Sequence, residues 1–138
     1  MRVAQRIDYA MRAVTALAAL PENRMMPAGE LADRLGLPRR FVEQQVTVLV
    51  RHGIVRSRRG PGGGVALNRL AGQITAYEVI VAVQGDLLDV PRVSASAVSE
   101  MWGSAAESLE RHFKGIDLEE LAVRQRELDE MNGFMYHI

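Results

Sequence analysis

Arginine supplies nearly all the positive charge of this 138-residue chain, because it accounts for 16 of the 17 basic residues. A guanidinium group can bind a phosphate or a guanine edge through two parallel hydrogen bonds, which an ammonium group cannot do. Residues 1–69 carry a net charge of +7, and residues 70–138 carry a net charge of −7. This asymmetry favours a first half that contacts a polyanion. The alternative is two solvated surfaces of opposite sign.

One group of polar side chains has the chemistry needed to read base edges. In the major groove, Arg can bind guanine, Gln can bind adenine and Glu can accept a hydrogen bond from cytosine. Residues 38–52 are predicted to form a helix, because Val42, Val46 and Leu49 recur at helical spacing and leave a polar opposite face. An ordinary charged surface helix is the alternative. The predicted contact residues are Pro38, Arg39, Arg40, Glu43, Gln44, Thr47 and Arg51.

A second group of arginines flanks a glycine-rich turn. The run Gly60-Pro61-Gly62-Gly63-Gly64 separates two short apolar segments, residues 54–56 and 65–67, which predicts a β-hairpin. Glycines let the backbone approach DNA closely, and arginine is attracted to the negative potential of a narrow minor groove. A solvated turn is one alternative. A nucleotide-phosphate loop is disfavoured, because the run lacks a following Lys-Ser or Lys-Thr. The predicted hairpin contacts are Arg56, Arg58, Arg59, Gly60 and Gly62.

The elements that must hold these residues form a helix-turn-helix followed by a hairpin, or wing. Gly36 has the position of a helix stop, and Thr75 and Asp117 have the spacing of helix caps. Apolar spacing predicts helices over residues 6–20, 28–35, 38–52, 76–84, from 94 or 96 to 113, and 117–131. We expect less order from residue 132 onward. The predicted fold is mainly α with a small β-hairpin. It comprises a winged helix-turn-helix domain (1–85), then a long dimerisation helix and a C-terminal helix (86–138).

The long helix predicted after residue 94 has an apolar face that needs a partner. From residue 96 to 113 it would span roughly 27 Å. Such a stripe is more often dimer core than a ligand site. A two-fold homodimer would present two recognition helices about one DNA turn, or roughly 34 Å, apart. The predicted interface contains Val98, Met101, Trp102, Ala105, Leu109 and Phe113.

The composition excludes several function classes. The chain contains no cysteine, which excludes disulfides, thiolate metal sites and a catalytic thiol. His52, His112 and His137 lack metal-ligand spacing, and no catalytic constellation stands out. No apolar run approaches the roughly 18 residues of a membrane span, and no secretory signal opens the chain. We therefore expect a cytoplasmic protein that is not an enzyme, binds no metal and contacts no membrane.

Several stretches of the sequence together resemble a known family. Arg6-Ile7-Asp8-Tyr9-Ala10 opens the first helix, and Phe41-Val42-Glu43-Gln44 lies in the third. Arg59-Gly60-Pro61-Gly62-Gly63-Gly64 forms the hairpin tip, and Trp102 lies in the long helix. With Ile116-Asp117-Leu118-Glu119-Glu120-Leu121 after that helix, the pattern resembles the Rrf2 family of bacterial transcription regulators. The resemblance covers nearly the whole chain, most strongly residues 1–85.

The resemblance implies a winged-helix dimer that binds a palindromic operator in double-stranded DNA, in most members as a repressor. It implies that the long helices of two subunits pair and that the last helix packs back toward the DNA-binding part. In such a dimer, Arg2, Arg6 and Tyr9 would hold backbone phosphates. Many members sense redox state, nitric oxide, iron or cysteine supply.

The main departure from the family lies at its iron–sulfur cluster. Many members hold the cluster with three cysteines before the long helix. The last of these corresponds to Ser96, and a histidine ligand found in one member type corresponds to Ser99. A hydroxyl group does not replace a thiolate as a ligand for iron. The loop between Gly85 and Trp102 is also shortened, which favours a naturally clusterless member over a cysteine-to-serine variant.

We therefore predict no cofactor, and a regulatory input that is either a small-molecule effector or a partner protein. A different function is also compatible with a winged helix, namely a protein–protein interaction module whose DNA binding is weak or lost. The net charge of +7 on residues 1–69 argues against that alternative, because a protein-binding wing has no need of several arginines.

Overall fold

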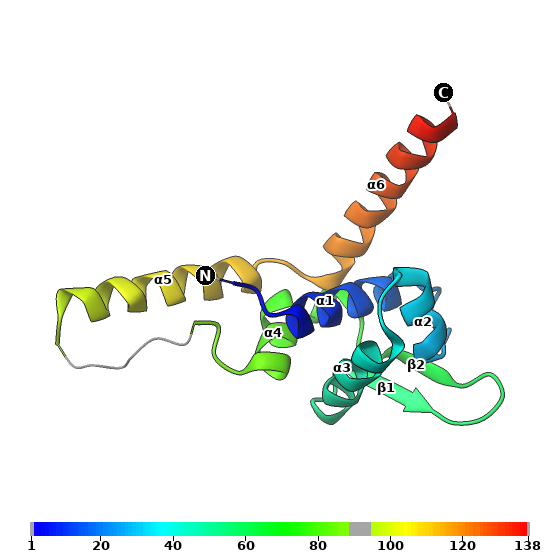
Figure 1. The fold of residues 1–138 in the computed structure, drawn as a ribbon, viewed down its shortest axis with the longest axis horizontal. Helices are drawn as coiled ribbons and strands as arrows, with labels where there is room; N and C mark the ends of the chain where they lie inside the picture. The colour runs from blue at the N-terminus through cyan, green and yellow to red at the C-terminus, as the bar shows by residue number, and fades with distance from the viewer. Residues whose placement is uncertain (1, 89–94, 138) are drawn as a thin grey trace.

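The computed structural model describes residues 2–88 and 95–137 (Figure 1). A helical body carries a two-stranded hairpin, while α5 and the second half of α6 extend away from it in different directions. This is the predicted fold, mainly α with a small hairpin. The elements in chain order are α1 (Gln5–Ala18), α2 (Ala28–Leu35), α3 (Arg39–Arg51), β1 (Val55–Arg58), β2 (Gly64–Leu67), the 3-10 helix η1 (Ala71–Gln73), α4 (Ala76–Gln84), α5 (Ala97–Lys114) and α6 (Leu118–His137).

The turn between α2 and α3 depends on a glycine, as predicted. Gly36 has a φ of +66°, a left-handed conformation that costs glycine little. The next N–H, that of Leu37, donates to the Ala32 carbonyl at 3.0 Å and closes the last turn of α2. Leu31 of α2 and Leu49 of α3 are buried in the same core, and α1 packs on both helices. The helix-turn-helix is therefore one packed unit, from which α3 presents its other face.

The hairpin is anchored at its base to the segment before α2. Its strands are antiparallel, with Val55 opposite Leu67, and they run further toward the tip than the sequence predicts. Met26 and Val65 exchange two backbone hydrogen bonds, of 3.0 and 2.8 Å. A Cβ at Gly64 would lie 2.5 Å from the Met26 backbone, so this close approach requires glycine. The wing is thereby fixed to the helix-turn-helix at its base while its tip extends outward (Figure 1).

Each of the last three α-helices begins at a side-chain cap. The Glu78 N–H donates to Thr75 Oγ1 at 3.2 Å, which confirms the cap predicted for α4. At α6 the Glu120 N–H donates to Asp117 Oδ1 at 2.9 Å, as predicted. At α5, Ser96 is the cap, accepting from an N–H at 3.0 Å. These oxygens satisfy backbone donors that have no partner inside the helix.

Only the first half of α6 belongs to the body. Leu118 and Ala122 are buried, and this end of the helix packs on α1 and η1. The helix continues to His137, whereas the sequence predicts less order from residue 132. Residues 132–137 contain no proline to break it. Across the described residues, no helix combines the length and apolarity that a membrane-spanning segment requires.

Candidate DNA interface

The polar face of α3 is turned to solvent. Arg40, Gln44 and Arg51 are exposed. Their side chains form no ion pair or hydrogen bond with any of the described residues, 2–88 and 95–137. Glu43 is exposed as well, and its carbonyl accepts a hydrogen bond of 2.9 Å from the Thr47 hydroxyl. The arginines and the glutamine of this face are therefore free to bind groups outside the chain.

Arg39 differs from its neighbours on α3 because it is held by α2. Its Nε donates to Asp33 Oδ1 at 2.9 Å, and its Nη2 pairs with Asp33 Oδ2. This hydrogen bonding lowers the pKa of Asp33 and raises the pKa of Arg39. The guanidinium also lies beside Gly29, where an added Cβ would come within 3.4 Å of it. Arg39 thus links the two helices of the motif, a role that the sequence pattern does not indicate.

The hairpin tip combines one fixed arginine with two free ones. Arg58 Nη2 donates to the Gly62 carbonyl at 3.1 Å, across the loop. Arg56 and Arg59 are exposed and have no such contact in the described chain. Gly60 and Gly62 have φ values of +91° and +75°, so both adopt backbone conformations that favour glycine. Arg58 therefore braces the loop that carries Arg59.

An aromatic pair lies beside these arginines. The ring of Tyr9 on α1 packs against Phe41 on α3, with 6.5 Å between centroids. Phe41 is 46% exposed, although it is a large apolar residue at the start of the predicted recognition helix. Phe41 is not among the contact residues that the sequence predicts. Its position directly after Arg39 and Arg40 is the signal that could have identified it as a surface residue. Arg2 and Arg6, also predicted contacts, are exposed nearby along the chain.

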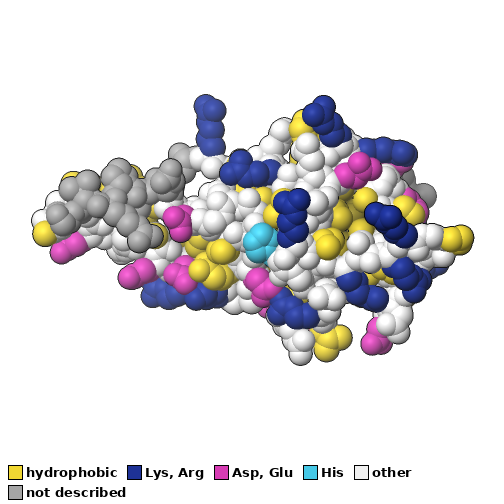
Figure 2. Space-filling view, turned by 90° about the horizontal axis from the view of Figure 1, so that it is seen from below, with side chains coloured by type: hydrophobic (Ala, Val, Ile, Leu, Met, Phe, Trp, Pro, Cys, Tyr) yellow, Lys and Arg dark blue, Asp and Glu magenta, His cyan; other side chains and the backbone are white. Residues whose placement is uncertain are grey.

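The two ends of the molecule differ in surface chemistry. Figure 2 shows the molecule from the side on which α3 and the hairpin lie in Figure 1. Lys and Arg side chains are spread over the body, while the end that α5 forms shows hydrophobic and acidic side chains, with basic ones along its lower edge. Pro38 is exposed at the start of α3. The predicted contact residues thus come from the segment before α1, from α1 and α3, from Pro38 just before α3, and from the hairpin.

The apolar stripe of α5 is not covered in the described chain. Val98 is 60% exposed and Met101 is 52% exposed. The remaining members of the stripe are partly exposed, and no residue of α5 is buried. A continuous apolar face of this kind marks an interaction surface. The other predicted interface residues are Trp102, Ala105, Leu109 and Phe113.

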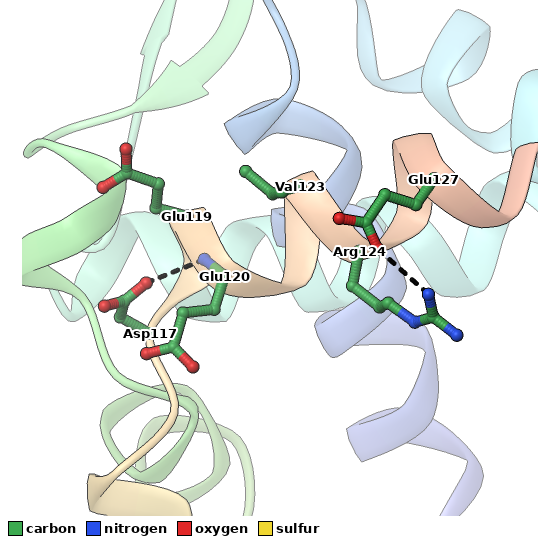
Figure 3. Close-up of a pocket in the computed structure, with 6 residues that line it drawn as sticks. All are labelled: Asp117, Glu119, Glu120, Val123, Arg124 and Glu127. Carbon is green, nitrogen blue, oxygen red and sulfur yellow. Dashed lines mark hydrogen bonds and ion pairs between the residues drawn. The ribbon is translucent and has the colours of Figure 1, made fainter. Parts of the chain in front are cut away.

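An open hollow of about 410 Å³ lies along the first half of α6 (Figure 3). It is lined mainly by carboxylates, and three of its polar side chains interact within the helix itself. Asp117 caps the helix, and Arg124 Nη1 pairs with Glu127 Oε2 at 2.9 Å. In residues 2–88 and 95–137, no group of three His, Asp or Glu side chains is placed to hold a metal ion. The full lining is Asp117, Glu119, Glu120, Val123, Arg124 and Glu127.

A helix-turn-helix, a basic wing and an extended apolar helix define a class of proteins, the winged-helix transcriptional regulators. The family model Rrf2, described as an iron-dependent transcriptional regulator, matches residues 3–124. The chain belongs to the Rrf2 family. It is 31% identical to the HTH-type transcriptional regulator IscR of Xenorhabdus nematophila, over 94% of this chain and 84% of that protein. It is also 31% identical to IscR of Cronobacter sakazakii, over 94% and 85% of the two proteins.

Solved structures agree with this assignment. The structure of T. potens IscR matches with a TM-score of 0.83 and 26% identity, covering 99% of this chain and 96% of that one. CymR, the global cysteine regulator of B. subtilis, matches with a TM-score of 0.79 and 24% identity, over 90% and 98% of the two chains. The second likeness concerns the fold alone. The chain is a DNA-binding transcriptional regulator and not an enzyme.

The family description names iron, and the residues of this chain do not fit a cysteine-ligated iron–sulfur cluster. The sequence contains no cysteine at all. Ser96, which corresponds to a cluster cysteine in the resemblance above, instead caps α5 by accepting the Ser99 N–H at 3.0 Å. A serine hydroxyl used as a helix cap supplies no thiolate for iron. The predicted regulation without a cluster therefore needs an input of another kind.

Proposed function

We propose that the protein acts as a homodimer on a palindromic operator and represses transcription in the cytoplasm, without an iron–sulfur cluster. The observation that supports this most strongly is the combination of two surfaces in one chain. A body with unpaired arginines presents α3 and the wing, and a separate helix exposes an apolar stripe. Two chains joined by α5 would place two α3 helices on successive turns of DNA, about 34 Å apart. Residues 1–85 would bind DNA, and residues 86–138 would join the subunits.

In this dimer α3 enters the major groove. Arg40 and Gln44 contact guanine and adenine edges, and Glu43 accepts from cytosine. Farther along the helix, Thr47 meets a thymine methyl group or a phosphate, and Arg51 meets a phosphate. Pro38 and Arg39 fix the start of the helix against the DNA backbone.

The wing and the N-terminal segment supply the remaining contacts. Arg59 enters the minor groove, where the negative potential favours a guanidinium group. Arg56 and Arg58 lie along its edge, and the left-handed Gly60 and Gly62 shape the loop. Phosphates beside the groove are held by Arg2, Arg6 and Tyr9. The dimer core is formed by Val98, Met101, Trp102, Ala105, Leu109 and Phe113.

The regulatory input of the proposed repressor is either a small molecule that binds near the junction of α4, α5 and α6, or a partner protein. Such a ligand would act by shifting the population of dimers between arrangements that differ in half-site spacing or in the position of the wing. It can do so only through different affinities for those arrangements.

The proposal is tested by recovering DNA with the purified full-length protein from fragments of its own genome and sequencing what is retained. We expect a shared two-fold symmetric sequence. On that sequence the affinity should fall steeply with salt, because bound arginines release counterions. A weak affinity that hardly changes with salt would favour the protein–protein interaction module instead. A monomer by sedimentation, in the concentration range where DNA is bound, would contradict the dimer.

A further inference from the structure

The end of α5 is fastened to the start of α4 through the backbone. The Ala76 N–H donates to the Ile116 carbonyl at 2.8 Å, and the Leu118 N–H donates to the Ile74 carbonyl at 3.0 Å. Together these bonds form a short antiparallel bridge. The bridge holds the chain at one place, just beyond the last residue of α5. Attachment at one place does not by itself fix the direction in which a helix points.

A cluster of three side chains makes a second contact between α4 and α5. Lys114 Nζ on α5 lies 4.7 Å from the centre of the Tyr77 ring on α4, within the range of a cation–π interaction. The same ammonium group pairs with Glu110 Oε1, one turn back along α5, at 2.7 Å. The hydrogen bond from Lys114 lowers the pKa of Glu110, with a smaller contribution from Tyr77. The same bond raises the pKa of Lys114, so both groups are charged at neutral pH.

The direction of α5 has little other support. Among the described elements, α4 is the only one with which α5 makes extensive contact, and no residue of α5 is buried. Figure 1 shows the helix extending away from the body. An 18-residue helix is about 27 Å long. A rotation of about 10° at its fastened end would move its far end by about 5 Å, which exceeds the roughly 3.4 Å rise of one base pair.

We infer that the cluster of Tyr77, Glu110 and Lys114 sets the direction of α5, and thereby the separation of the two half-sites that the dimer accepts. The inference rests on the proposed function, because it requires two chains joined through α5. The three side chains are positioning residues: they affect DNA binding only through the angle between α5 and the body.

The contact itself can be measured without DNA, because Lys114 is the only lysine in the chain. Reductive methylation with ¹³C-formaldehyde labels Lys114 and the α-amino group, whose ordinary pKa values are about two units or more apart and so distinguish the signals. The Tyr77 ring current should move the Lys114 methyl signal upfield. In Tyr77→Leu this displacement should disappear. An identical Lys114 signal in the two proteins would overturn the inference.

The effect on half-site separation is measured on duplexes built from a retained genomic sequence, with the half-sites moved apart or together in steps of one base pair. The wild type should bind one separation at least tenfold more tightly than its neighbours. In Lys114→Met and Tyr77→Leu this ratio should fall at least threefold, while the affinity for a single half-site stays unchanged. Lys114→Arg should restore the ratio, because a guanidinium group also stacks on an aromatic ring.

Arg124→Met is the matched control. It removes one positive charge from an exposed ion pair of 2.9 Å on α6, outside the cluster, and should keep the wild-type ratio. If both Lys114→Met and Tyr77→Leu kept that ratio, with unchanged helix content and dimer mass, the inference would be wrong and the proposed function would stand. If the wild type bound no duplex, or bound as a single subunit, the proposed function would fail and the inference with it.

Discussion

The basic residues of the proposed DNA-binding face and those elsewhere differ in how often a carboxylate neutralises them: among the described residues, one of eight on the face, Arg39, forms an ion pair, against five of eight elsewhere. On the face, Arg40 and Arg59 are exposed and unpaired among the described residues. Outside it, five basic side chains form exposed ion pairs with a neighbouring Asp or Glu. These are Arg12, Arg34, Arg69, Lys114 and Arg124.

This difference concerns function more than stability. An exposed ion pair typically contributes 1 kcal/mol or less, so pairing or not pairing an arginine changes folding little. An arginine without a partner, however, is available to a phosphate or a base without first losing a carboxylate. Arg39 and Arg58 are intermediate, because each is held by a group of the chain while remaining on the face. The comparison therefore separates arginines that are free to bind DNA from arginines whose guanidinium is already held by another group of the chain.

The largest effect on DNA affinity is expected for a variant that separates the two chains of the proposed dimer. Met101→Glu introduces a charge into the apolar stripe of α5 at a position that is 52% exposed in the single chain, so the chain should still fold. Loss of the dimer makes each half-site bind alone, and we expect the affinity for a two-half-site duplex to fall roughly 100-fold or more. Sedimentation and fluorescence anisotropy measure both effects.

The control for the dimer prediction is Leu70→Glu. This residue is even more exposed but lies outside the stripe, and its variant should remain dimeric. A Met101→Glu protein that stayed dimeric and kept its affinity would show that α5 does not join the subunits.

A second prediction concerns the shape of the wing. A Cβ at Gly63 would lie 2.2 Å from the Arg58 carbonyl oxygen, so Gly63→Ala must displace the loop that carries Arg59. We expect DNA affinity to fall about tenfold, within the cost of losing a base or groove contact. Thermal unfolding should change less, because the tip lies outside the core. Gly103→Ala in α5 is the control, since no atom of the described residues lies within 4 Å of its added methyl group.

Removing single arginines tests directly whether unpaired and held arginines contribute differently to DNA binding. Arg59→Ala should weaken operator binding by about 1–3 kcal/mol, and a lost phosphate contact would lower the salt slope by about one. Arg58→Ala should have a smaller effect, because its guanidinium is already bound to the Gly62 carbonyl at 3.1 Å. Arg34→Ala, in an ion pair on α2, should change binding least. Titrations at several salt concentrations measure the loss of DNA affinity in each of the three variants. Equal losses in all three would show that unpaired arginines do not differ from held ones in DNA binding.

The sequence predicts those parts of the molecule that depend on local rules. The turn at Gly36 and the cap at Thr75 follow from the conformations and hydrogen bonds of single residues, and both are present. The hairpin follows from two apolar segments around a glycine run. Each of these features depends on residues that are close together in the sequence, so each can be predicted without knowing how the helices pack.

Contacts between distant segments could not be predicted in the same way. The ion pair of Arg39 with Asp33 depends on how α2 and α3 cross, and the bridge between Met26 and Val65 joins segments far apart in the chain. The sequence places Arg39 at the start of the helix, among the predicted contact residues, but gives no sign that it faces α2. The base contacts and the dimer interface remain predictions, because they depend on DNA and on a second chain.

The smallest effect is expected at the Asp33–Arg39 pair, whose contribution to the melting temperature depends on pH. Hydrogen bonding to Arg39 lowers the pKa of Asp33 below its ordinary value of 3.8. A lowered carboxyl pKa stabilises the folded state above the unfolded-state pKa, and this contribution is lost as the pH falls through the lower, folded-state value. Asp33→Asn lacks it at every pH, so its melting temperature should lie slightly below that of the wild type at pH 5–7. The two melting temperatures should converge below pH 3.8.

Arg39→Met is the control, because it removes the cause of the lowered Asp33 pKa. Adding Asp33→Asn to Arg39→Met should have no further pH-dependent effect on the melting temperature. A difference in melting temperature between wild type and Asp33→Asn that grew on acidification would contradict the ion pair, and with it the view that Arg39 links α3 to α2.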